Sequence, residues 1–153
     1  MKKIYKSVVK TFFKFFYGDI KFIYKKSENF LLRLISKEGK KYTIFKVPNC
    51  RIYTDTIHDT AYLYKNKIIS NISFQIRNKV NVDVKKNSVF NKGTPKILNK
   101  LNGSTASLLT GGGGNNNYWH WMYDALSRIY FFEKNFKLNH FDYFLVPDKK
   151  YKF

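Results

Sequence analysis

Near the start of the chain, apolar and aromatic residues recur at the three- and four-residue spacing of an α-helix, with lysines on the opposite positions. The lysines return every four residues from Lys2 to Lys14, and Gly18 and Asp19 mark the predicted helix end. The sequence therefore predicts a basic amphipathic helix. It opens a segment that composition delimits at residues 1–38 and that we expect to be helical. The apolar residues of this helix are Ile4, Tyr5, Val8, Val9, Phe12, Phe13 and Phe16.

From about residue 41 to residue 78 the apolar period changes to two, and β-branched and aromatic residues are frequent. This pattern is typical of short strands that pair as antiparallel hairpins. Residues 79–105 are polar and interrupted by glycine and proline, which predicts an irregular connection with one short helix at 97–101. The predicted strands lie at residues 42–44, 52–53, 61–64, 68–69 and 72–76.

The last third of the chain has the order strand, glycine-rich loop, helix, strand. We expect strands at residues 107–110 and 142–146, the second of them buried, and a helix at 118–135. This order is a βαβ unit, which implies parallel pairing. Residues 39–153 are therefore expected to form an α/β domain with a Rossmann-like unit at its end. The predicted inner helix face consists of Met122, Ala125, Leu126, Ile129 and Phe132.

Composition changes this picture in two respects. An apolar fraction of 44% and an aromatic fraction of 19% exclude a disordered chain. The net charge of +19 raises nucleic-acid binding as an alternative. However, only four of the 29 basic residues are Arg, the residue that supplies bidentate base contacts, which argues against nucleic acid. The single cysteine, Cys50, and three scattered histidines predict neither a disulfide framework nor a metal site.

The basic amphipathic helix leaves two interpretations open. Residues 1–17 have the pattern of a helix that lies on an anionic membrane surface. Alternatively, the apolar face packs on its own domain or on a partner segment. Lys10 and Lys14 interrupt the apolar run that a signal peptide needs, so we expect a cytoplasmic chain, peripheral at the inner face of the membrane if this helix binds there.

A loop of four glycines and three asparagines follows the predicted strand and precedes the predicted helix. In α/β proteins ligands bind at this position, outside the carboxyl end of a strand and at a helix N-terminus. The loop matches neither a dinucleotide fingerprint nor a P-loop. A flexible turn is the alternative, because Gly and Asn tolerate left-handed backbone. The candidate substrate-binding residues are Gly111, Gly112, Gly113, Gly114, Asn115, Asn116 and Asn117, of which Asn116 or Asn117 would cap the helix.

The first turns of the predicted helix carry the candidate chemistry. His120, Asp124 and Arg128 are spaced at i, i+4 and i+8, so they share one face. His120 is the candidate general base or hydroxyl-binding group, and Asp124 would fix its tautomer. Trp119 and Trp121 flank the histidine and are candidate sugar-binding residues, with Arg128. The alternatives are an Asp–Arg pair on a polar helix face and tryptophans in the core.

These residues resemble the N-terminal signature of glycosyltransferase family 61. The resemblance rests on residues 93–96, on residues 107–109 and on the run from Asn117 to Arg128, Asn-Tyr-Trp-His-Trp-Met-Tyr-Asp-Ala-Leu-Ser-Arg. Ser127 stands where the family usually has proline, and residues 144–147 resemble the next strand of the family. The resemblance covers about residues 50–153.

The resemblance implies an enzyme of the GT-B type that moves a sugar from a nucleotide donor, usually a UDP-sugar, to a glycan hydroxyl. Bacterial members resemble capsule or lipopolysaccharide enzymes, and their donor nucleotide lies mostly on the C-terminal domain. This chain would therefore be the N-terminal, acceptor-side part, truncated before the donor-binding half and weakly active or inactive alone. No permanently bound cofactor is implied, and the metal requirement is left open. The remaining alternative is a basic module that binds membranes or nucleic acid without catalysis.

Overall fold

The computed structural model describes most of the chain as a mixed α/β fold in two compact units. Unit 1 comprises residues 1–96 and unit 2 comprises residues 97–153. The compositional boundary at residue 38 falls inside unit 1, between two strands that pair with each other. The described residues are 2–24, 27–37, 40–56, 58–92, 98–109 and 118–146.

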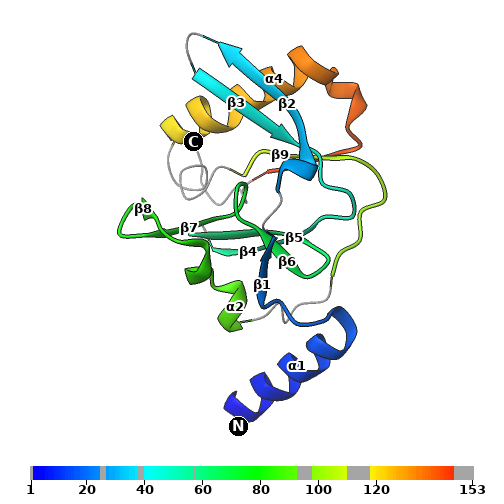
Figure 1. Ribbon diagram of the computed structural model, residues 1–153, viewed down its shortest axis with the longest axis vertical. Helices are drawn as coiled ribbons and strands as arrows, with labels where there is room; N and C mark the ends of the chain where they lie inside the picture. The colour runs from blue at the N-terminus through cyan, green and yellow to red at the C-terminus, as the bar shows by residue number, and fades with distance from the viewer. Residues whose placement is uncertain are drawn as a thin grey trace. The chain divides into compact units, whose positions relative to one another are not determined.

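The N-terminal helix, α1, spans Lys2–Tyr17, and the sequence prediction of a basic helix ending before Gly18 is confirmed. Gly18 adopts a positive φ of 76°, and its N–H donates to the Lys14 carbonyl at 2.9 Å. A glycine in this conformation is a common helix end, because it has no Cβ to clash. Figure 1 shows α1 extending away from the sheet of unit 1.

The main sheet of unit 1 is built around β5 (Asp59–Tyr64). One edge of β5 pairs with β4, while the other edge pairs with β7 near its start and with β6 near its end. The predicted antiparallel hairpins are confirmed. Two of them turn on paired residues with positive φ, 65–66 and 78–79, as two-residue hairpin loops do. The other strands are β1 (Phe22–Tyr24), β4 (Arg51–Thr56), β6 (Lys67–Ile69), β7 (Phe74–Arg77) and β8 (Val80–Asn81).

Two strands replace helix in the segment 1–38. β1 pairs in parallel with β6, and β2 (Leu31–Lys37) forms a separate antiparallel ribbon with β3 (Lys40–Phe45). A 3₁₀ turn at Ser27–Phe30 precedes β2. The expectation that the whole segment is helical is wrong after Tyr17. Short apolar runs fit either structure, and here strand pairing decides the outcome, with the distant β6 for β1 and with the neighbouring β3 for β2.

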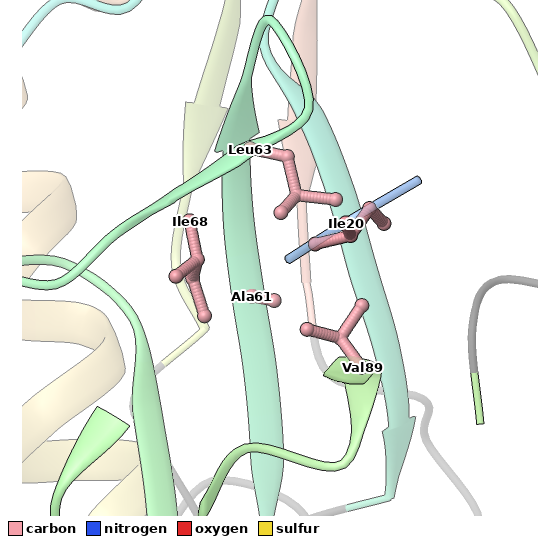
Figure 2. Packing of buried hydrophobic residues seen from close by; sticks show 5 residues of the cluster. All are labelled: Ile20, Ala61, Leu63, Ile68 and Val89. Atoms are coloured by element: carbon pink, nitrogen blue, oxygen red, sulfur yellow. The ribbon is translucent and has the colours of Figure 1, made fainter. Parts of the chain in front are cut away.

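The core of unit 1 gathers on one face of β5 (Figure 2). Ala61 and Leu63 point to this face because they are two residues apart in the strand. Ile20, Ile68 and Val89 pack against them, and all five are buried. The segment before β1, the strand β6 and the start of α2 are therefore joined through one apolar cluster.

After β8 a 3₁₀ turn (Val84–Lys86) leads into the short helix α2 (Val89–Lys92). The Asp83 carboxylate caps the turn by accepting from the Lys85 N–H at 2.8 Å. The predicted helix at 97–101 is wrong, because the described residues 98–102 contain no helix. The residues that form helix in this connection come earlier, where Val89 is anchored in the core.

Unit 2 contains the predicted βαβ unit. β9 (Thr105–Ser107) and β10 (Tyr143–Leu145) pair in parallel, as the predicted βαβ order requires. Both strands differ in detail from the prediction: Leu108 and Leu109 are buried but lie beyond β9, and β10 exposes Tyr143 and Phe144. In the described part of unit 2 this sheet has two strands. Between them lie α3 (Tyr118–His120), a π-helical turn (Trp121–Ala125), α4 (Leu126–Phe136) and a 3₁₀ turn (Leu138–His140).

Candidate functional site

The candidate site lies at the start of the helix of unit 2, where the structure brings His120 and Asp124 together. The His120 Nδ1 lies 2.7 Å from Asp124 Oδ2, and both side chains are about half exposed. A carboxylate only accepts hydrogen bonds, so Nδ1 is the donor and Nε2 holds the lone pair of the neutral ring. The pair therefore has the geometry in which a carboxylate orients an imidazole whose other nitrogen accepts a proton.

A π-helical turn lies between His120 and α4, and Asp124 is part of it. The Leu126 N–H donates to the Trp121 carbonyl, so the turn holds one residue more than an α-helical turn. Such turns occur frequently at functional sites. The extra residue rotates the start of the helix relative to α4, which explains why Met122 is exposed although Ala125 is fully buried. The prediction that Met122 belongs to the inner face of the helix is therefore wrong.

An aromatic surface lies on the same turns. Trp119 is 64% exposed and Tyr123 is 68% exposed. Their rings stack with centroids 5.9 Å apart and planes within 8°. Tyr118 meets Trp119 edge-on at 6.1 Å. Stacked, exposed rings offer a flat apolar face with polar edges, the form of surface on which a sugar ring can lie. Sequence analysis missed Tyr123, although its spacing from Trp119 equals that of Asp124 from His120.

The other predicted binding residues have different positions. Arg128 donates from Nη1 to the Leu109 carbonyl at 2.7 Å, so it ties α4 to the backbone just after β9. Trp121 is partly buried. The predicted loop itself, Gly111–Asn117, lies outside the described residues, as do residues 93–96 and Pro147 of the family resemblance.

Among the described residues, Cys50, Asp59 and the potential metal ligands do not form a second candidate site. Cys50 is partly buried, and this burial raises the pKa of its thiol to about 11, so the reactive thiolate is scarce. Asp59 is buried in an ion pair with Arg77 at 3.1 Å and accepts from the Ser88 N–H, which is a structural role. The part of the chain that the structure describes holds no group of three or more potential metal ligands.

Comparison with protein-family models, curated proteins and solved structures finds no match for this chain. The resemblance to glycosyltransferase family 61 therefore stays a prediction from the motif. Within the described residues it rests mainly on residues 118–128, which carry the His120–Asp124 pair and the stacked rings.

Proposed function

We propose that this chain supplies the acceptor side of a glycosyl-transfer site in cell-surface polysaccharide synthesis. The donor would be a nucleotide sugar of the UDP-sugar class, and the acceptor a glycan hydroxyl. The observation that supports the proposal most is the contact of His120 with Asp124 directly beside the exposed Trp119–Tyr123 stack. A candidate base and a candidate sugar-stacking surface thus share two consecutive turns.

In the proposed reaction the acceptor hydroxyl transfers its proton to Nε2 of His120 while its oxygen attacks the anomeric carbon of the donor. The bond between that carbon and the diphosphate oxygen breaks, and the nucleotide diphosphate leaves with the bonding electrons. Asp124 holds the ring through Nδ1 and stabilises the imidazolium that forms. The donor nucleotide would be bound by a GT-B-type C-terminal domain, as the family resemblance implies.

The remaining candidate residues would shape the acceptor cleft. Trp119 and Tyr123 would hold the acceptor ring by stacking, whereas Trp121, two residues from each and partly buried, lies off this face of the helix. Arg128 would act as a positioning residue, because its bond to the Leu109 carbonyl holds the backbone that follows β9 against α4. The predicted substrate-binding residues Gly111–Asn117 would contribute backbone N–H groups to substrate binding.

The His120–Asp124 pair contributes little to the stability of the fold, so a substitution of His120 tests activity without unfolding the protein. A half-exposed ion pair or hydrogen bond of this kind stabilises a protein by about 0–1 kcal/mol. A positioned general base, in contrast, accelerates a reaction by roughly 10²–10⁴-fold. Replacing His120 should therefore leave the unfolding midpoint almost unchanged and remove most of the transfer activity.

The test is sugar transfer from a panel of UDP-sugars to oligosaccharide acceptors by this chain combined with a donor-binding C-terminal domain, measured as the release of UDP. His120→Asn is compared with His140→Asn, an exposed histidine of the same unit outside the candidate site. We expect His120→Asn to lower transfer by at least 100-fold with unchanged folding, and His140→Asn to retain it. Equal transfer by the wild type and His120→Asn would refute the assigned role of His120.

A further inference from the structure

The N-terminal helix turns its apolar face away from its own domain. Six apolar or aromatic residues of α1 are between 61% and 85% exposed. They fall within an arc of about 120° when the helix is viewed along its axis at 100° per residue. An ordered helix that leaves such a stripe uncovered presents an interaction surface. The six residues, called the apolar face below, are Ile4, Tyr5, Val8, Phe12, Phe15 and Phe16.

The opposite side of α1 contacts the rest of unit 1 through the C-terminal half of the helix. Phe13 is buried, and the Arg51 guanidinium lies 6.0 Å from the centre of its ring. Arg51 also donates to the Tyr17 carbonyl at 3.3 Å and to Asn66 Oδ1 at 3.0 Å. One arginine from β4 therefore joins the end of the helix to the hairpin turn between β5 and β6.

Two lysines of the same side add polar contacts. Lys10 donates from Nζ to the Asn91 carbonyl of α2 at 3.2 Å. Lys14 forms an ion pair with Asp19 at 3.0 Å, and Asp19 pairs equally with Lys21. The two lysines hold the pKa of the Asp19 carboxyl below its usual range, with the Lys21 hydrogen bond as the largest cause. The side of α1 that faces the rest of unit 1 is thus basic and aromatic, and the apolar face is directed outward.

The charge of the helix identifies the class of partner. α1 carries five lysines and no acidic residue, within a chain of net charge +19. A second copy of this chain would bring like charge against like charge, and a nucleic acid would leave the apolar face in water. An anionic lipid surface satisfies both features, because acyl chains cover apolar residues and headgroups attract lysines.

We propose that α1 docks the protein on an anionic membrane surface, with its apolar face in the headgroup and acyl boundary and unit 1 on the water side. The helix would lie in the plane of the surface. No helix among the described residues is long and apolar enough to cross a bilayer, and α1 itself has 16 residues. Lys3 and Lys6 precede the turns of α1 that contact the rest of unit 1, and their charges would attract the anionic headgroups.

The first experiment measures co-sedimentation of the full chain with phosphatidylcholine vesicles that contain or lack phosphatidylserine. We expect binding to the anionic vesicles that weakens as salt rises. Phe12→Ser and Phe16→Ser should each lower the partition coefficient by about tenfold, and Lys3→Gln or Lys6→Gln by about fivefold. The matched control is Phe22→Ser in β1, whose ring is 63% exposed but lies outside α1.

The second experiment tests insertion separately from charge attraction. Phe15→Trp and Phe22→Trp variants are mixed with anionic vesicles that contain brominated lipids. We expect quenching of the new tryptophan at position 15 above that of the wild type, and no added quenching at position 22. The proposal is overturned if anionic and neutral vesicles bind equally, if the Phe12 and Phe16 variants bind like the wild type, or if position 15 stays unquenched. It is also overturned if the apolar face instead drives self-association, seen as a dimer mass that the Phe12 and Phe16 variants abolish.

Discussion

Asn87 is the buried residue whose replacement should destabilise unit 1 most clearly. Its side chain is fully buried where β5, β7 and α2 meet. Nδ2 lies within 3.3–3.5 Å of the carbonyls of Thr60 and Phe74 and of Gln75 Oε1. Oδ1 accepts from the Val89 N–H at 3.1 Å. One amide therefore bridges two strands whose direct pairing is short and also anchors the first turn of α2.

The expected cost of Asn87→Ala follows from these bonds. Two donated hydrogen bonds are lost, each with a net contribution of about 1 kcal/mol. The Val89 N–H is left buried without an acceptor, which costs about 1–3 kcal/mol. The sum is about 3–5 kcal/mol, a large part of the stability of a domain of this size. With a urea dependence of about 2 kcal/mol/M, the unfolding midpoint should fall by about 1.5 M or more.

The adjacent Ser88 provides the matched control. Its hydroxyl is buried and makes no hydrogen bond in the structure, so Ser88→Ala removes an unsatisfied polar atom. This variant should be neutral or slightly stabilising. Urea unfolding followed by far-ultraviolet circular dichroism compares the two variants with the wild type. If Asn87→Ala shifts the midpoint no more than Ser88→Ala does, the amide bridge does not stabilise unit 1 as argued.

Three further outcomes are expected. Gly103→Ala should destabilise unit 2 by about 1–3 kcal/mol, because Gly103 has a φ of 140° and an added Cβ would lie 2.5 Å from Asp142 Oδ2. Urea unfolding measures this change, and an unchanged midpoint would contradict it. Hydrogen bonds from the Ser104 N–H and hydroxyl lower the pKa of Asp142, so its charge stabilises the fold above about pH 4. The stability difference between the wild type and Asp142→Asn should therefore be constant near neutral pH and shrink as the pH falls below about 4; a difference that grows there would have the wrong sign. Iodoacetamide at pH 8 should alkylate Cys50 roughly 100-fold more slowly in the folded chain than in the unfolded chain, because the raised pKa of the folded thiol leaves little thiolate. Mass spectrometry measures the two alkylation rates, and equal rates would refute this prediction.

The parts of the fold that the sequence predicted are those with long or local patterns. The helix α1 repeats its apolar spacing over four turns, and the hairpins around β5 combine a period of two with turn residues. The βαβ order of unit 2 required parallel pairing, and β9 and β10 pair that way. β1 was missed because its conformation depends on a partner far along the chain: Phe22 pairs with Lys67. β2 pairs with the neighbouring strand β3, and its short apolar run was assigned to the helical segment.

The candidate site was predictable to the extent that it depends on spacing within one helix. His120 and Asp124 are four positions apart, and this spacing alone predicts their contact. The π-helical turn has no comparable signal, because it consists of one additional residue within a helical pattern. The sequence did not predict the orientation of α1 either. This orientation depends on the contact between Arg51 and Phe13, which are close only in the folded chain.

The central claim is that the first turns of the unit 2 helix bind a glycan acceptor, and its most direct test is saturation-transfer difference NMR with a panel of oligosaccharides. The wild type is compared with Trp119→Ala and with Tyr130→Ala, which removes an exposed ring from the same helix beyond the candidate site. The account predicts saturable binding of at least one oligosaccharide, a loss of at least tenfold in affinity for Trp119→Ala and none for Tyr130→Ala. Absence of binding throughout the panel, or equal affinity of the wild type and Trp119→Ala, would contradict it.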